Sequence, residues 1–260
     1  MTTEKIELGR RLFFDRRLSR DNSVSCASCH DPERAFSDDR SVAVGVFQRK
    51  GRRNSPALIN RGYGRSFFWD GRVTTLEEQV LKPIEDSNEM DLPLSEAAAR
   101  VSLAPGEISR ALASFVRSIL SGDSPFDRYI KGDRAALTPE QQAGLQLFRG
   151  RANCTACHVG PNFTDERLHN TGIAWRDGRF TDVGAGQGNF KTPTIREIAR
   201  TAPYMHDGSL ATLDAVIEYY DRGGNQNPGL DPEIRALRLT FAEKRALIAF
   251  LRALNGPLYR

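Results

Sequence analysis

Two short stretches decide the fold of this chain, Cys26-Ala27-Ser28-Cys29-His30 and Cys154-Thr155-Ala156-Cys157-His158. They contain all four cysteines of the 260-residue sequence, so no thiol is left for a disulfide framework. A Cys-x-x-Cys-His pentad is the attachment signature of a c-type haem, whose vinyl groups bond to both thiols while the histidine ligates the iron. A four-thiolate zinc site or a redox dithiol would not need a histidine directly after each cysteine pair. The sequence therefore predicts two covalently bound haem c groups, one at each pentad.

The rest of the chain has mainly helical patterns. Apolar residues recur at helical spacing from Ile108 to Ile119 and again from Leu247 to Leu251, and little of the sequence alternates like a strand. Thr-x-x-Glu or Thr-x-x-Gln sequences that begin at Thr75, Thr138 and Thr240 resemble the capping boxes that start helices. These features predict a mainly α fold.

The length favours two domains, because a single domain commonly has about 150 residues. The turn-forming stretch Ser121-Gly122-Asp123-Ser124-Pro125 lies between the two pentads and marks the expected boundary. We therefore expect two cytochrome c-like domains, residues 1–121 and 122–260, each with one covalently bound haem c.

Charge and hydropathy limit the possible partners and location. The net charge is only +4, and four haem propionates would offset it by about four negative charges, so no nucleic acid partner is expected. No run of about 18 apolar residues could span a membrane, and residues 1–5 lack the apolar stretch of a signal peptide. Because c-type haem is attached outside the bacterial cytoplasm, we expect a periplasmic protein whose secretion signal is absent from this chain.

The two halves repeat one plan. The corresponding motifs are Gly9-x-x-Leu12-Phe13 and Gly144-x-x-Leu147-Phe148, Ser55-Pro56 and Thr192-Pro193, and Phe68-Trp69-Asp70-Gly71 and Met205-His206-Asp207-Gly208. The last two pairs share a shift of 137 residues, which predicts that each half is one haem-binding unit. Differences between matching positions then distinguish the two haem sites.

The second axial position of each iron separates electron transfer from chemistry on a small molecule. After Gly208, apolar residues from Leu213 to Ile217 share a helical face with Tyr220, so we expect Tyr220 to face inward and Tyr219 not to. Tyr220 could be a plain core aromatic, and Met205 is a rival ligand. The matching position in the first half is Pro83, which has no donor atom, so the first haem is expected to be open.

An open haem that binds peroxide needs a polar group to move protons. Glu89 and Gln79 are candidates, since Gln79 lies one helical turn before Pro83. A solvated helix face is the alternative interpretation of both side chains.

These motifs resemble, in order and over nearly the whole chain, those of the bacterial di-haem cytochrome c peroxidases and their relative MauG. The matching stretches are Glu7-Leu8-Gly9, Leu12-Phe13-Phe14-Asp15, Arg53-Asn54-Ser55-Pro56, Phe68-Trp69-Asp70-Gly71-Arg72 and Thr201-Ala202-Pro203-Tyr204-Met205-His206-Asp207-Gly208. The resemblance implies a peroxidatic haem in the amino-terminal domain, an electron-storing haem in the carboxy-terminal domain and a calcium ion between the haems. Asn54 and the carbonyls of Thr201 and Pro203 would hold the calcium, and Trp69, which could otherwise be plain core, would relay electrons.

Two departures from the peroxidase pattern indicate the MauG-like branch. Typical peroxidases carry a distal histidine where this chain has Val46, and a methionine cap on the second haem where it has Tyr220. MauG resembles this chain in both respects. Gln79 and Glu89 fall where the family keeps its distal catalytic pair. The surface tryptophan through which electrons leave the MauG substrate is Ala152 here, which indicates a different protein partner.

The resemblance thus implies a MauG-like oxidoreductase that uses hydrogen peroxide to form a high-valent di-haem state and oxidises Trp or Tyr residues of a partner protein. One alternative is a peroxidase that reduces hydrogen peroxide to water with electrons from a small cytochrome c or cupredoxin. Another is a non-catalytic electron carrier, which would ligate both irons fully.

Overall fold

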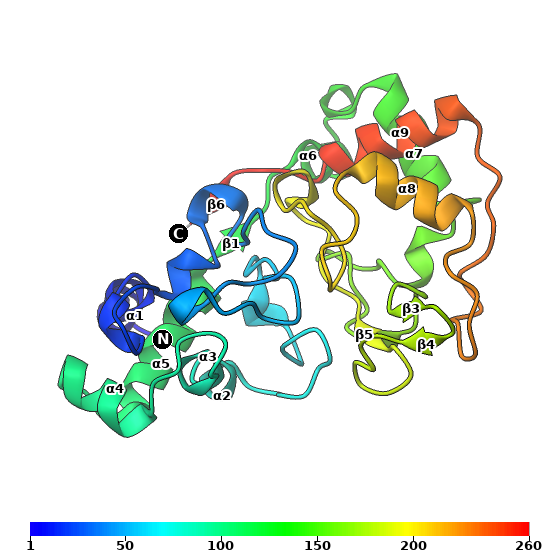
Figure 1. The fold of residues 1–260 in the computed structure, drawn as a ribbon. Coiled ribbons are helices and arrows are strands. Elements are labelled where there is room, and N and C mark those ends of the chain that lie inside the picture. Colours follow the sequence, from blue (N-terminus) through cyan, green and yellow to red (C-terminus); the bar gives the residue numbers. More distant parts are fainter. Residues whose placement is uncertain (260) are drawn as a thin grey trace.

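The fold is mainly helical, with two lobes that follow one another along the chain (Figure 1). A computed structural model describes residues 1–259. One hydrophobic core gathers buried side chains between Leu12 and Ile119, and a second gathers those between Phe126 and Leu254. The mainly α part of the predicted fold class is confirmed. Among the described residues, no helix has the length and apolar character needed to cross a membrane.

The elements are short. The α-helices are α1 (Thr3–Phe13), α2 (Leu76–Gln79), α3 (Lys82–Glu85), α4 (Leu94–Val101), α5 (Pro105–Ser118), α6 (Pro125–Ile130), α7 (Pro139–Arg149), α8 (Leu213–Asp221) and α9 (Phe241–Arg252). The 3-10 helices are η1 (Arg16–Leu18), η2 (Cys26–Ser28), η3 (Pro32–Arg34), η4 (Val46–Gln48), η5 (Arg61–Tyr63), η6 (Arg134–Ala136), η7 (Cys154–Ala156) and η8 (Ile198–Arg200). The antiparallel strand pairs are β1 (Leu120–Ser121) with β6 (Leu258–Tyr259), β2 (Leu168–His169) with β5 (Phe190–Lys191), and β3 (Trp175–Arg176) with β4 (Arg179–Phe180).

The three threonines predicted to cap helices do so. Thr138 and Thr240 form complete capping boxes, in which side chain and backbone exchange hydrogen bonds with Gln141 and Glu243. Thr75 accepts a hydrogen bond from the backbone N–H of Glu78 at 3.2 Å. These local bonds satisfy N–H groups that the first turn leaves without partners.

The internal repeat is confirmed where two helices cross in each half. Helix α1 packs on α5 through Gly9, and a Cβ added there would lie 2.0 Å from the carbonyl oxygen of Ala111. Helix α7 packs on α9 through Gly144, and an added Cβ would lie 1.9 Å from the carbonyl oxygen of Ala246. Each half therefore needs glycine at the crossing, because any side chain would push the helices apart.

Aromatic packing repeats with the same geometry. The rings of Phe13 and Phe115 lie 5.1 Å apart at 59°, and those of Phe148 and Phe250 also lie 5.1 Å apart at 59°. The two cores are thus built alike, which brings each pentad to an equivalent place in its own half.

The segment between the halves is fixed by both. The backbone N–H of Ser121 donates to Asn60 Oδ1 at 3.0 Å, and its hydroxyl donates to Glu197 Oε1 at 2.6 Å. Asn60 and Glu197 are matching positions of the repeat. The chain end also returns from the second lobe, because β6 pairs with β1 and Leu258 packs against the first core (Figure 1). The division into residues 1–121 and 122–260 remains a prediction.

Candidate functional site

One cavity of about 620 Å³ is lined by residues of both halves. From the two pentads, its lining includes Cys29, His30, Cys154, Cys157 and His158. Cys26 packs against the first core instead. It lies one turn before His30, and the backbone N–H of His30 donates to the Cys26 carbonyl at 3.0 Å. The fold therefore brings both pentads, 128 positions apart in the chain, to one cavity.

The pentad histidines are oriented alike. Nδ1 of His30 lies 2.9 Å from the carbonyl oxygen of Phe36, and Nδ1 of His158 lies 2.9 Å from that of Phe163. A proton on Nδ1 that is donated to a carbonyl leaves the Nε2 lone pair free for a metal. Burial lowers the pKa of both histidines, which favours the neutral form that ligation needs.

Three of the pentad thiols have raised pKa values. Burial raises the pKa of Cys26 and Cys154 to about 12 and that of Cys29 to about 11. Redox-active dithiols instead need a lowered thiol pKa. Around them the cavity has apolar walls, which on the second half include Leu213, Val216, Ile217, Leu247 and Leu251. Thiols, histidines and apolar walls together fit two covalently bound haem groups.

Glu89, Gln79 and Pro83 all line the first half of the cavity. Burial, with a smaller effect of Asp86, raises the pKa of Glu89 to about 7. The carboxyl lies close enough to the first pentad for its charge to raise the pKa of the Cys29 thiol. A carboxyl group that titrates near neutral pH in a cavity is suited to proton transfer.

Val46 does not line the cavity, although typical relatives carry a distal histidine there. Its side chain is fully buried, and its N–H donates to the Glu89 carbonyl at 2.8 Å. At the preceding Gly45, an added Cβ would lie 2.2 Å from the carbonyl oxygens of Asn88 and Glu89. The loop at Val46 therefore supports the segment that carries Glu89.

Tyr220 and Met205 both line the second half of the cavity. Burial raises the pKa of the Tyr220 phenol above its ordinary value. The expectation that Tyr219 does not face inward is wrong, since Tyr219 is only 3% exposed. Its hydroxyl donates to the Thr171 carbonyl at 2.8 Å and accepts from the Asn225 N–H at 3.1 Å. Loop residues thus bury the side of α8 that faces away from the cavity. The helical spacing of apolar residues cannot predict this burial, because it depends on segments outside the helix.

Other potential iron ligands are occupied or remote. Nδ1 and Nε2 of His169 lie 2.5 Å and 2.9 Å from the carboxylates of Asp231 and Asp165. Met90 is buried in the first core. Ala152, expected at a surface position from the resemblance, is only 7% exposed and lines the cavity.

Trp69 is held by the main chain of both halves. Its indole N–H donates to the Asn54 carbonyl at 2.8 Å, and its own carbonyl accepts from the Lys191 N–H at 2.7 Å. The Asn54 N–H donates to the His206 carbonyl, also at 2.7 Å. Because Asn54 corresponds to Lys191 and Trp69 to His206, the halves exchange matching hydrogen bonds. The pairing of Trp69 with His206 in the sequence repeat is therefore seen again in these hydrogen bonds, although the sequence does not predict the bonds themselves.

The three predicted calcium ligands, Asn54, Thr201 and Pro203, line the same cavity. The Asn54 amide nitrogen donates to the Arg40 carbonyl at 2.9 Å, which identifies Oδ1 as the atom that could bind a cation. Within residues 1–259, no group of three or more His, Cys, Asp or Glu side chains could hold a metal ion. The predicted ligands are of another kind, one amide and two main-chain carbonyls.

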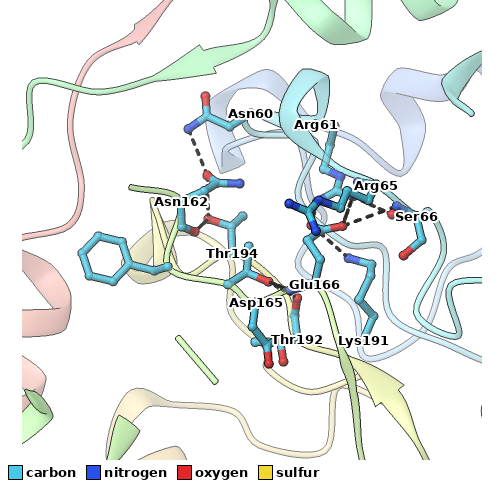
Figure 2. A network of polar contacts seen from close by, with 12 residues as sticks. Asn60, Arg61, Arg65, Ser66, Asn162, Asp165, Glu166, Lys191, Thr192 and Thr194 are labelled. Atoms are coloured by element: carbon cyan, nitrogen blue, oxygen red, sulfur yellow. Dashed lines mark hydrogen bonds and ion pairs between the residues drawn. The ribbon is translucent and has the colours of Figure 1, made fainter. Parts of the chain in front are cut away.

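Polar contacts tie the two halves together around the cavity (Figure 2). Arg61 donates to Glu166 Oε1 at 2.8 Å, and the Asn60 amide donates to Asn162 Oδ1 at 3.2 Å. Arg53 donates to Asp182, with its Nε 2.7 Å from Oδ2. The relative position of the two pentads therefore rests on hydrogen-bonded charge pairs as well as on packing.

A mainly helical chain that repeats one unit, with two Cys-x-x-Cys-His pentads at one cavity, has the architecture of a di-haem c-type cytochrome. Comparison with known proteins defines the family. The family model for di-haem cytochrome c peroxidase matches residues 3–107. The chain belongs to the di-haem cytochrome c peroxidase and MauG family, and it is an enzyme, either a peroxidase or another peroxide-dependent oxidoreductase.

Relatives of both kinds match almost the whole chain. The methylamine utilization protein MauG of Methylorubrum extorquens is 38% identical over 98% of this chain and 79% of its own length. Cytochrome-c peroxidase IdrP2 of Denitromonas iodatirespirans is 35% identical over 97% of this chain and 82% of its own length. A solved MauG-like protein associated with microbial copper homeostasis is 35% identical, with a TM-score of 0.89 over 99% of this chain and 90% of its own.

Proposed function

We propose that this chain is a MauG-like oxidoreductase, which reacts with hydrogen peroxide at an open haem held by His30 and withdraws electrons from residues of a periplasmic partner protein. One observation carries the proposal. Among the described residues of the first half, His30 is the only His, Met or Tyr that lines the cavity. The other side of that haem would therefore be free for peroxide.

The haem groups would be attached through the two pentads. Cys26, Cys29 and His30 would hold one haem in residues 1–121, and Cys154, Cys157 and His158 would hold the other in residues 122–260. Once bound, the two irons supply the redox chemistry that the side chains lack. Asn54 Oδ1 and the carbonyls of Thr201 and Pro203 would hold a calcium ion between the haems.

The side chains around the open haem would manage protons and peroxide. A Glu89 carboxylate oxygen would take the proton of the bound peroxide and return it to the leaving oxygen, and a pKa near 7 supports this role. Gln79 would hold the polar network, and Pro83 would keep the site free of a protein ligand.

The second half would store an oxidising equivalent. Tyr220 would hold the iron of the second haem together with His158, since an anionic oxygen ligand favours the oxidised states of iron. Trp69, bonded to the main chain of both halves, would relay electrons between the two sites.

A second candidate is a peroxidase that reduces peroxide to water with electrons from a small cytochrome c or cupredoxin. The 35% identity to a relative named cytochrome-c peroxidase favours it. Both candidates need hydrogen peroxide and a redox partner protein, so they differ in what supplies the electrons.

Mixing the resting, fully oxidised protein with hydrogen peroxide in a stopped-flow spectrometer tests the proposal. We expect an immediate spectral change without prior reduction, and an oxidised state that persists when no donor is present. No change until one electron is added would contradict the open haem. Rapid turnover with reduced cytochrome c would instead support the peroxidase.

A further inference from the structure

Two buried cations, Lys191 and Arg61, lie beside one carboxylate, that of Glu166 (Figure 2). The exposed fractions of their side chains are 7% and 9%, and that of Glu166 is 10%. Both cations line the cavity, whereas Glu166 is not among its lining residues. The positive groups therefore lie between the carboxylate and the open space.

Glu166 has little capacity left for Lys191. Its Oε1 accepts from Arg61 at 2.8 Å, and its Oε2 accepts from the backbone N–H groups of Arg65 at 3.1 Å and Ser66 at 3.5 Å. The Lys191 ammonium lies 3.7 Å from Oε1, which is beyond hydrogen-bond length. An ammonium has three donors, and the long contact with Glu166 engages at most one of them, so the others remain available toward the cavity.

The charges do not balance within the protein. Two cations share one carboxylate, which leaves a net positive charge in a place largely shielded from water. Burial, and then repulsion by Arg61, lowers the pKa of Lys191 to about 8. An ionised group that is buried without a full partner is costly, because its charge loses the solvation of water. An anion that enters from the cavity side would remove this cost.

Position in the repeat supports an anion as the ligand. Lys191 corresponds to Asn54, whose Oδ1 is the predicted cation ligand. At this matching position, the first half thus carries an oxygen acceptor, Asn54 Oδ1, and the second half carries an ammonium donor, that of Lys191. We propose that Lys191, assisted by Arg61, binds a propionate carboxylate of one of the two haem groups. This inference rests on the proposed haem attachment and adds a residue that would set the potential of a haem.

The proposal predicts a change in redox potential. Without the ammonium, the negative propionate is uncompensated and favours ferric over ferrous iron, so the midpoint potential of that haem falls. The unpaired propionate also takes up a proton more readily, so its haem potential becomes pH-dependent near neutral pH.

Spectroelectrochemical titration of the two-haem protein at several pH values is the test. In Lys191→Gln, we expect one midpoint potential to fall and to gain a pH dependence, while the other haem serves as an internal control. Lys191→Arg keeps the charge and should restore the original behaviour. The control is Lys131→Gln, which removes the same charge from a side chain that is 72% exposed. It should alter neither midpoint potential.

The double variant Lys191→Gln/Glu166→Gln distinguishes two roles of Lys191, binding a propionate and neutralising Glu166. It removes one positive and one negative charge together, so the fold is not left with an unpaired buried carboxylate. If Lys191 binds a propionate, the new pH dependence persists in this variant. Potentials equal to those of the unchanged protein in both variants would overturn the inference. The haem content of the unchanged protein distinguishes failure of this inference from failure of the proposed function. Fewer than two haems per chain would overturn the proposed function, whatever the potentials show.

Discussion

Glu89 combines a buried carboxyl, a place beside the first pentad and a pKa of about 7. Because the deprotonated form accepts the proton of peroxide, the rate of the peroxide reaction should rise with pH through about 7. Glu89→Gln should slow that reaction about 10²-fold or more and remove this dependence. Stopped-flow rates across pH measure both effects, with Glu85→Gln, an exposed neighbour, as the control. An unchanged pH profile in Glu89→Gln would assign proton transfer to another group.

Tyr220 and its neighbour Tyr219 offer a matched pair of substitutions. Tyr220→Phe removes the proposed axial oxygen, so peroxide should still react at the first site while the long-lived oxidised state is lost. Tyr219→Phe removes a hydroxyl that is bonded to the Thr171 carbonyl, and it should keep that state. Optical spectra after peroxide addition measure the difference.

Met205 is the rival ligand for the second haem, because its side chain lines the same part of the cavity as Tyr220. Thioether ligation would give a sulfur-to-iron charge-transfer band in the near-infrared spectrum of the ferric protein. Finding that band, and finding it again in Tyr220→Phe, would rule out Tyr220 as ligand and the MauG-like assignment with it.

Residues whose role follows from local chemistry could be predicted from the sequence. The pentads need only five consecutive residues, and Pro83, Gln79 and Glu89 are close in the chain and line one cavity. The cluster of Arg61, Glu166 and Lys191 could not be predicted, because its members meet only when the two halves come together.

The crossing of α7 and α9 depends on one glycine. In Gly144→Ala, the new Cβ would lie 1.9 Å from the Ala246 carbonyl oxygen and 2.8 Å from Phe250 Cβ. We expect the free energy of unfolding to fall by about 1–3 kcal/mol, the usual cost of overpacking. Urea denaturation followed by circular dichroism measures it. Gly122→Ala has no atom within 4 Å of the new Cβ and serves as the control. Equal urea midpoints for Gly144→Ala and Gly122→Ala would show that α7 and α9 can move apart without loss of stability.

Helix positions were easier to predict than other elements. Capping boxes at Thr138 and Thr240 are local, so the starts of α7 and α9 follow from the sequence. The two-residue strands were not predicted, because each forms only by pairing with another segment. In β1 and β6, for example, Leu120 pairs with Tyr259, at the far end of the chain. Two residues are too few to show an alternating pattern.

The repeat explains how residues of both pentads line one cavity. The backbone bonds from Asn54 to His206 and from Lys191 to Trp69 are equivalent under the shift of 137 residues. Two copies of one unit thus face each other through matching positions. The repeat could be predicted from the sequence, but the orientation of the halves could not, because it depends on contacts that no motif encodes.

Charge pairs across the interface should make the assembly sensitive to acid. Burial opposes ionisation of Asp182, but its hydrogen bonds from Arg53 outweigh burial and hold its pKa at about 2. A carboxyl with a lowered pKa stabilises the fold fully above its ordinary pKa of about 4, and this contribution is lost as pH falls toward about 2. Asp182→Asn should therefore lower the free energy of unfolding at pH 7 by about 2 kcal/mol, since one pKa unit equals about 1.4 kcal/mol.

Urea denaturation of both proteins at pH 7 and at pH 3 checks this prediction. The difference in unfolding free energy should shrink at pH 3, because the Asp182 carboxyl is then mostly protonated in the unfolded chain and must lose that proton on folding. Asp177→Asn, at an exposed carboxylate of the β3–β4 hairpin, controls for the loss of one charge. A difference that is the same at both pH values would mean that Asp182 acts through packing. In that case, acid would have to loosen the halves through another pair, such as Arg61 and Glu166.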